Sequence, residues 1–269
     1  MPTFYPSSSA FMIGDLVVTK YNSGCLRSIL IKANGIREGE IAPIYQQVGA
    51  LAENLHASEL DAAGKSYERE VVIRVPLSTA VTYSGRADFV LDGEIVDEVK
   101  GHISKNTRRD VIRKGEYNVS YLAQLVSYMV KLRCPRGRLV CGYFEEDADG
   151  SLIKQEERVF RVEIDDEAGI DVDGEPSGYC VADLLAHQRA AVRVLETGEI
   201  AARPDKWNQK YGGPCTQCPF KSACDKHDKE PSGTQAFLQT ARSCLEELQP
   251  KAPPVAFKVK LRKAKKETK

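Results

Sequence analysis

The chain has 269 residues, of which 42% are hydrophobic and 28% are charged. These fractions are near the averages for globular proteins, which excludes disorder, collagen and a coiled coil as descriptions of the whole chain. No run approaches the roughly 18 apolar residues of a membrane span, and Met1–Phe11 lacks a basic start followed by an apolar run. We therefore expect a cytoplasmic protein that does not bind membranes.

Positive and negative charges balance over the whole chain, with 38 lysines and arginines against 38 aspartates and glutamates. The balance hides a basic tail at 251–269, which holds eight basic residues and one acidic residue. Its prolines and like charges predict a disordered segment. The tail could bind DNA or could only improve solubility, and the sequence leaves both open.

Strand signals are concentrated in the middle of the chain. Residues 1–9 are rich in turn formers and are expected to be irregular, and 14–20 holds an apolar stretch that fits a strand or a helix end. Valine, isoleucine, threonine and aromatic residues then predict a meander of three strands over 70–77, 81–91 and 95–100.

Helical periodicity surrounds this meander. The predicted helices are 25–32, 44–62, 117–132, 181–196 and 234–248. Two further strands are predicted at 138–144 and 158–164. The order predicts an α/β or α+β fold in which helices flank a mixed sheet.

The densest chemical signal is a G-R-x-D motif that ends at Asp88, followed ten residues later by an E-x-K motif at Glu98 and Lys100. Two carboxylates on neighbouring strands can share a hard divalent cation such as Mg²⁺. Lys100 points to the same side of its strand as Glu98, because side chains alternate with period two. There a lysine can orient a metal-bound water or neutralise charge on a phosphate.

The loop between these strands decides whether the two carboxylates meet. A two-residue turn would put Asp88 and Glu98 on opposite surfaces. A three-residue loop over 92–94 puts Asp88 directly opposite Glu98, on the same face as Val90 and Val96. We predict the three-residue loop, since only that register makes a site. The other face then carries Phe89, Leu91, Ile95 and Val99.

Two predicted helices carry polar side chains that suit such a site. Gln124 and Tyr128 are four residues apart and share one helix face. They could place an amide and a phenol beside the metal or a phosphate. His56 lies on the earlier helix, and Glu53, three residues before it, shares its face. Either His56 or Glu53 could complete the metal shell.

Cysteines form the second signal. Cys215, Cys218 and Cys224 fall within ten residues flanked by glycine and proline, which indicates metal binding rather than a disulfide framework. As fourth ligand, His227 would complete a zinc site, whereas Cys25 would complete an all-cysteine site for zinc or an iron–sulfur cluster. We interpret the others as buried or incidental thiols, namely Cys134, Cys141, Cys180 and Cys244.

Taken in order, these motifs resemble the RecB-type nuclease module with a four-iron four-sulfur (4Fe-4S) cluster. That module is found in AddB and in CRISPR-associated RecB-like exonucleases, including solitary copies in phages. The resemblance covers about residues 15–228. It implies a restriction-endonuclease-like PD-(D/E)xK fold, with an iron–sulfur clasp that joins the N- and C-terminal segments.

The resemblance also implies roles for individual residues. Asp88 and Glu98 would be metal ligands, Lys100 the catalytic lysine and His56 the helix ligand, with Glu53 as a possible substitute. Gln124 and Tyr128 would be the active-site helix pair. The cluster ligands would be Cys25, Cys215, Cys218 and Cys224. We therefore expect a nuclease domain over 1–228, a C-terminal helix within 229–250 and the basic tail over 251–269.

The implied function is a DNA exonuclease that uses Mg²⁺ or Mn²⁺ on single strands or frayed ends, with 5′ to 3′ polarity. CRISPR integrase proteins or phage recombination proteins would be its partners. Five basic residues after the E-x-K strand favour a nucleic-acid substrate, because they would lie at the mouth of the site and contact phosphates. They are Lys105, Arg108, Arg109, Arg113 and Lys114.

Two other functions compete with this one. A DNA-end-binding subunit of an integrase or recombination complex would use the cluster only for structure, but the complete set of polar motif residues disfavours an inactive module. A zinc-ribbon regulator built on His227 and the three clustered cysteines would explain only the C-terminal part of the chain.

We predict that deleting residues 251–269 weakens DNA binding and flattens its dependence on salt, because each basic residue at a phosphate releases a counterion. Oligonucleotide affinity measured over a salt series for the full and the truncated chain tests this. Identical slopes would mean that the tail does not contact DNA.

Overall fold

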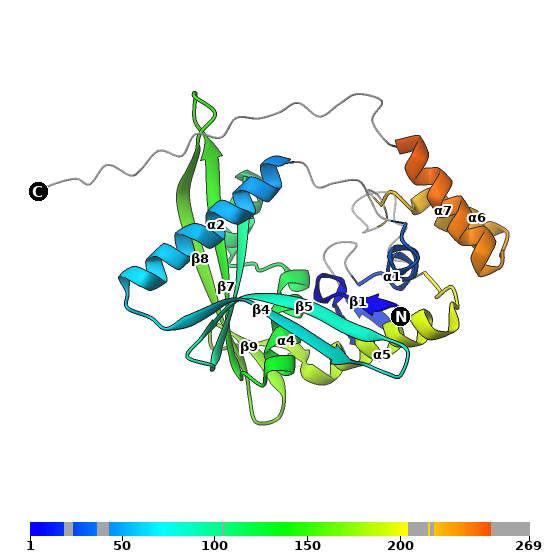
Figure 1. The fold of residues 1–269 in the computed structure, drawn as a ribbon, viewed down its shortest axis with the longest axis horizontal. Helices are drawn as coiled ribbons and strands as arrows, with labels where there is room; N and C mark the ends of the chain where they lie inside the picture. The colour runs from blue at the N-terminus through cyan, green and yellow to red at the C-terminus, as the bar shows by residue number, and fades with distance from the viewer. Residues whose placement is uncertain (19–23, 37–42, 104, 204–214, 216–217, 249–269) are drawn as a thin grey trace, which may run out of the picture.

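The computed structural model describes residues 1–18, 24–36, 43–103, 105–203, 215 and 218–248 (Figure 1). The predicted basic tail at 251–269 lies outside them. In these ranges every helix is too short or too polar to span a bilayer.

The predicted meander forms the centre of the fold. β4 (Tyr67–Pro76), β5 (Thr82–Leu91) and β6 (Ile95–His102) are successive antiparallel strands. α4 (Val119–Leu132) then leads to β7 (Arg136–Glu146), which lies parallel to β6. The meander followed by a helical crossover confirms the predicted mixed α/β architecture.

Further strands extend this centre at both sides. In the described part of the chain, eight strands form one sheet in the order β1-β5-β6-β7-β8-β9-β10, with β4 also paired to β5. The β1–β5 and β6–β7 pairs are parallel and the other pairs are antiparallel. The added strands are β1 (Thr3–Phe4), β8 (Leu152–Ile164), β9 (Gly169–Val172) and β10 (Glu175–Cys180). A separate hairpin consists of β2 (Phe11–Ile13) and β3 (Leu16–Val18).

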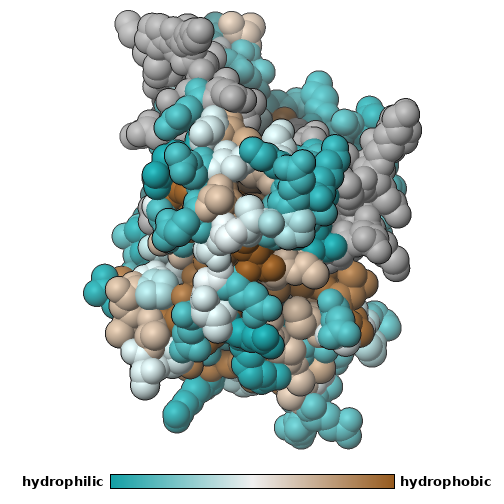
Figure 2. All heavy atoms as spheres, turned by 90° about the vertical axis from the view of Figure 1, so that its right-hand side faces the viewer, coloured by the Kyte–Doolittle hydropathy of each residue, from teal (hydrophilic) through white to brown (hydrophobic). Residues whose placement is uncertain are grey.

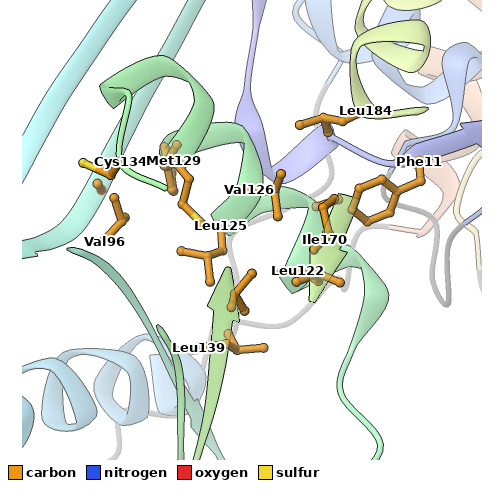
Figure 3. Packing of buried hydrophobic residues seen from close by; sticks show 14 of the residues in the cluster. Phe11, Val96, Leu122, Leu125, Val126, Met129, Cys134, Leu139, Ile170 and Leu184 are labelled. Carbon is orange, nitrogen blue, oxygen red and sulfur yellow. The ribbon is translucent and has the colours of Figure 1, made fainter. Parts of the chain in front are cut away.

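Two helices cover opposite faces of the meander. α2 (Pro43–Ala62) packs on the face that carries Phe89, Leu91 and Val99. α4 packs on the other face, in the cluster that contains Val90 and Val96. Figure 3 shows Leu125 and Met129 of α4 beside Val96 and Leu139. The predicted faces are therefore confirmed for Val90 and Val96 on one side and for Phe89, Leu91, Ile95 and Val99 on the other.

Four other helices form a second group next to the sheet (Figure 1). A small core joins them, built from residues such as Ile31, Val194, Phe220 and Phe237. Figure 2 views the side of the molecule that carries this group, with hydrophobic side chains gathered in the lower half and hydrophilic ones over much of the upper half. The helices are α1 (Leu26–Ala33), α5 (Val181–Thr197), α6 (Lys221–Lys229) and α7 (Thr234–Leu248).

The start of the chain is more ordered than predicted. Phe4 is fully buried and lies in β1, which pairs with β5, and a 3₁₀ turn follows at Pro6–Ser8. Two helices were also missed, α3 (Lys105–Lys114) and α6. Both are short and polar, so tertiary contacts rather than apolar periodicity define them.

We predict that Gly101→Ala destabilises the fold by about 1–3 kcal/mol, because α2 packs directly on β6 at this glycine. A Cβ at Gly101 would lie 2.5 Å from the backbone oxygen of Val48. Gly49→Ala in α2 is the matched control, since a Cβ there meets nothing within 4 Å. Alanine should stabilise that helix position by about 0.5–1 kcal/mol. Chemical denaturation measures both, and equal effects would contradict the packing argument.

Candidate active site

The loop between β5 and β6 has the three residues that the sequence predicted. Glu94 N donates a hydrogen bond to Leu91 O at 2.9 Å, which closes the loop. Val90 then lies opposite Val96. This register, continued by two residues, brings position 88 opposite Glu98.

Strand β5 has two different neighbours along one edge. β6 pairs with it at 89–91 and β1 pairs with it at 82–83, whereas β4 occupies the other edge along most of its length. Among the described strands, none pairs with the first edge between these two stretches. The open stretch contains the G-R-x-D motif, 85–88. It forms a fork where β6 departs from β5.

Asp88 lies at this fork because the alternation of β5 changes there. Ala87 and Val90 both pack in the cluster under α4, although strict alternation would put them on opposite faces. Glu70 of the neighbouring strand has a φ of 57° at the same level. The Asp88 side chain reaches across the fork, where its Oδ2 accepts a hydrogen bond from Val99 N at 2.8 Å.

Glu98 and Lys100 enter the fork from β6. The Glu98 side chain is only 1% exposed, and its Oε1 forms a close ion pair with Lys100 Nζ. Its Oε2 is buried and has no hydrogen-bond partner in the described structure. A buried carboxylate oxygen without a partner is energetically costly. A bound cation would satisfy it.

Burial and mutual repulsion raise the pKa values of three carboxyl groups around the fork. Burial raises the pKa of Glu98 to about 7, with Lys100 opposing the shift and Asp88 adding to it. Burial also raises the pKa of Asp88, again against Lys100. Burial and then Asp88 raise the pKa of Glu53 on α2. A divalent cation among these groups would reverse the repulsion, so the donor set fits Mg²⁺ or Mn²⁺.

The carboxylates that the structure describes at the fork do not form a complete set of metal ligands by themselves. Within the described ranges, no three histidine, cysteine, aspartate or glutamate side chains converge as a complete set of ligands. Lys100 provides the positive charge at the fork instead. Burial lowers the pKa of Lys100, but Glu98 and Asp88 outweigh burial and hold it above its usual value. Lys100 is therefore a cation at neutral pH.

Gln124 and Tyr128 of α4 lie over the same fork. Gln124 Nε2 donates to Tyr128 Oη at 3.3 Å. Burial, with Glu98 next in effect, raises the pKa of Tyr128 to about 12, so the phenol keeps its proton. The motif glycine permits this approach, because a Cβ at Gly85 would lie 2.7 Å from Tyr128 Cε1.

His56 is not among the side chains that the fork brings together. Its Nε2 lies 2.8 Å from Asp97 Oδ2, and Arg138 Nε donates to Asp97 Oδ1 at 2.7 Å. Asp97 precedes Glu98 on β6 and therefore points to the α2 side of the sheet. The Nδ1 of His56 is buried without a hydrogen-bond partner in the described structure. Glu53, one helical turn earlier, pairs with Arg69 at 3.4 Å, and burial and then Asp88 raise its pKa. His56 as a metal ligand therefore stays a prediction, with Glu53 as its substitute.

The five basic residues expected to contact DNA lie on α3, directly after β6. Arg108 forms ion pairs with Glu145 at 3.4 Å and Glu156 at 3.1 Å, and Lys114 pairs with Asp110 at 3.1 Å. Acidic neighbours thus offset two of the five charges. The exposed remainder is Lys105, Arg109 and Arg113.

The sequence analysis missed two aromatic side chains next to Lys100. Lys100 Nζ lies 5.2 Å from the ring centroid of Tyr121. His102 stacks on Tyr143 with ring centroids 5.3 Å apart. Burial and Lys100 lower the pKa of His102 to about 4, so its ring is neutral at pH 7. His102 could have been predicted, because it follows Lys100 by two residues and so shares the strand face of Glu98 and Lys100. Nothing in the sequence places Tyr121 beside Lys100.

The four cysteines expected to bind a cluster lie near enough to raise one another's pKa values. Among the described residues, however, they are not arranged as a group of three or more ligands that could hold a metal. Burial raises the pKa of Cys25 to about 11, and Cys224 and Cys215 add to the shift. Burial raises the pKa of Cys218 to about 12, with Cys25, Cys224 and Cys215 again contributing. All four are free thiols. Two buried thiols, Cys215 and Cys224, and two half-buried ones, Cys25 and Cys218, thus influence one another, and such thiols suit a cation that takes thiolate ligands.

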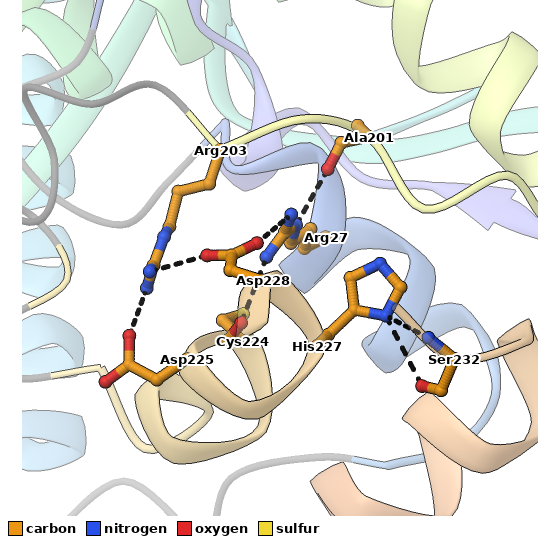
Figure 4. A network of polar contacts seen from close by, with 8 residues as sticks. All are labelled: Arg27, Ala201, Arg203, Cys224, Asp225, His227, Asp228 and Ser232. Carbon is orange, nitrogen blue, oxygen red and sulfur yellow. Dashed lines mark hydrogen bonds and ion pairs between the residues drawn. The ribbon is translucent and has the colours of Figure 1, made fainter. Parts of the chain in front are cut away.

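Two buried arginines lie beside these thiols (Figure 4). Arg27 Nη2 and Arg203 Nη2 reach the two carboxylate oxygens of Asp228 at 2.7 and 2.6 Å. Burial raises the pKa values of Cys224 and Cys215, while Arg27 and Arg203, respectively, oppose the shift. The arginines would therefore offset the negative charge of metal-bound thiolates.

His227 is occupied elsewhere. Its Nδ1 accepts a hydrogen bond from Ser232 N at 3.2 Å, and its ring lies against Phe237 with centroids 5.3 Å apart. In Figure 4 the ring points toward Ser232 rather than toward Cys224. Cys25 thus fits as the fourth ligand better than His227.

Three solved structures are similar to this chain. The alkaline exonuclease LHK-Exo from Laribacter hongkongensis gives a TM-score of 0.49 at 15% identity, covering 73% of this chain and 89% of that one. SSO0001 gives 0.43 at 16% identity, covering 82% and 87%. A phage-related exonuclease from Haemophilus somnus 129PT gives 0.42 at 12% identity, covering 63% and 80%. At these values the likeness assigns no activity, which rests on the fork itself. No protein-family model and no curated protein matches the chain.

We predict that Glu53→Gln weakens Mn²⁺ binding at least about 10-fold, because it removes one anionic ligand of the fork. Titration of free Mn²⁺ by electron paramagnetic resonance measures the affinity. Glu59→Gln on the same helix is the control and should bind Mn²⁺ as the wild type does. Equal affinities in the two variants would remove Glu53 from the site.

Proposed function

We propose that the chain is a divalent-metal-dependent DNA exonuclease whose active site is the fork between β5 and β6. One observation carries the proposal: Glu98 is buried beside Asp88 and Lys100, and one of its oxygens has no hydrogen-bond partner among the described residues. A cluster of buried charges of this kind destabilises the folded chain. Proteins commonly retain such clusters at functional sites.

Asp88, Glu98 and Glu53 would hold Mg²⁺ or Mn²⁺ in this proposal. The bound ion would supply an activated water and would stabilise negative charge on the phosphate. Lys100 remains protonated, so it attracts the phosphate and neutralises the charge that builds on it. Tyr128 also keeps its proton and can donate a hydrogen bond into the fork. Gln124 orients the Tyr128 hydroxyl.

Single-stranded or frayed DNA ends are the proposed substrate. The exposed lysine and arginines of α3 come directly after β6, the strand that carries Glu98 and Lys100. Their positive charges would attract the phosphate backbone of DNA. The 5′ to 3′ polarity remains a prediction from the sequence resemblance. So do CRISPR integrase or phage recombination partners.

We also propose that Cys25, Cys215, Cys218 and Cys224 hold a structural 4Fe-4S cluster. The support is that these four thiols, two buried and two half-buried, influence one another's pKa values although Cys25 is far from the others in the sequence, with two arginines beside them. Such a cluster would fasten the start of α1 to the segment before α6.

We predict that Glu98→Gln and Lys100→Met each lower the rate of DNA digestion at least about 100-fold. The first removes an anionic ligand of the metal, and the second removes the cation that neutralises charge on the scissile phosphate. Release of nucleotides from a labelled single strand with Mg²⁺ or Mn²⁺ measures the rate. Lys65→Met, at an exposed position, is the control. Wild-type rates in the two fork variants would refute the assignment.

We predict that Cys25→Ser loses iron and solubility as completely as Cys218→Ser, because both supply cluster ligands. Cys244→Ser is the control and should retain full iron and the brown colour. Iron and sulfide content per chain is the measurement. Full iron in Cys25→Ser, or zinc in the wild type, would overturn the cluster proposal.

A further inference from the structure

A pocket opens next to the fork on the α4 side of the sheet. Its volume is about 90 Å³, and its lining includes His102, Tyr117, Asn118, Tyr121 and Phe160. β6, the α3–α4 connection, the first turn of α4 and β8 supply these residues. None of them has a role in the proposed hydrolysis, so the pocket is available for a different part of the substrate.

The position of the pocket is set by the strand that carries Glu98 and Lys100. His102 follows Lys100 by two residues, so it lies on the same face about 7 Å farther along β6. Tyr121, which also lines the pocket, has its ring centroid 5.2 Å from Lys100 Nζ. Cys141, another lining residue, is the ladder partner of Lys100 on β7. The pocket is therefore one nucleotide unit or less from the proposed phosphate position.

The lining suits a flat, uncharged ring that carries hydrogen-bonding groups. Tyr117 and Phe160 meet edge to face with centroids 5.8 Å apart, and Tyr121 and His102 add two more rings. Asn118 and Thr107 bring an amide and a hydroxyl to the same lining. Aromatic faces with a few polar groups are the usual means of holding an unstacked base.

The charges at the pocket disfavour a phosphate. Asp110 and Glu116 belong to the lining and are acidic. Lys114 pairs with both, at 3.1 and 3.9 Å, so the three side chains together keep one negative charge. Lys100 lies at the fork, where it pairs with Glu98. A phosphate would therefore stay at Lys100, and the pocket would receive the neutral base attached to it.

We propose that this pocket is a nucleobase subsite that takes the unstacked base of the nucleotide next to the scissile phosphate. The inference deepens the proposed nuclease function, on which it rests for the position of that phosphate. Stacking the base in the pocket would hold a frayed or single-stranded end while its phosphate lies at the fork. A paired base cannot enter, which gives a physical reason for a preference for unpaired ends.

The test uses binding of oligonucleotides without a divalent cation, so it does not depend on catalysis. Single strands carry 2-aminopurine at the 5′ end in one series and at the 3′ end in another, because stacking on aromatic rings quenches its fluorescence. Thr107→Phe fills the pocket from α3. Asn106→Phe, the same substitution at the exposed neighbouring position, is the matched control. Tyr117→Leu is a second pocket variant, which removes a ring without adding bulk.

We expect the wild type and Asn106→Phe to quench one of the two terminal labels. Thr107→Phe and Tyr117→Leu should bind that end at least about 5-fold more weakly, the low end for loss of one base stack. Absence of quenching in the wild type, or equal quenching in all folded variants, would overturn the subsite. Quenching without DNA digestion by the wild type would instead retain the subsite and refute the nuclease proposal.

Discussion

The register between β5 and β6 is the constraint on which the proposed site depends. A loop of three residues fixes which side chains share a face, and one residue fewer would separate Asp88 from Glu98. One edge of β5 pairs with β1 near its start and with β6 near its end, and among the described strands it is open in between. Across this open stretch, the Asp88 side chain accepts a hydrogen bond from Val99 N. The site is thus a place where the sheet stops pairing, and α2 and α4 can both reach it.

Burial raises the pKa values of the carboxyl groups at this opening. Glu98 is enclosed on the α4 side together with Tyr128, and Glu53 approaches from α2. Asp88 adds to the rise in the pKa values of Glu98 and Glu53, and Lys100, Arg69 and Arg86 oppose only part of the effect of burial on the three carboxyl groups. At the second cluster, burial raises the pKa values of four thiols, so they hold their protons, and two arginines lie beside them. A cation that takes thiolate ligands would have to displace those protons.

The sequence predicted the parts of this structure that depend on local patterns. The meander, the length of the β5–β6 loop and the partnership of Gln124 with Tyr128 follow from period two, loop parity and helical spacing. The pairing of His56 with Asp97 could not be read from spacing, because it requires knowing which face of β6 packs on α2. The same holds for β1, whose burial depends on Tyr83 and α4 rather than on its own turn-rich sequence.

Crystallographic anomalous scattering from Mn²⁺ bound to the protein tests the central claim most directly. The account predicts one strong peak at the fork, coordinated by Asp88 and Glu98 with Glu53 completing the site, while His56 remains on Asp97. A peak coordinated by His56, or no peak at the fork when Mn²⁺ saturates the crystal, would contradict it.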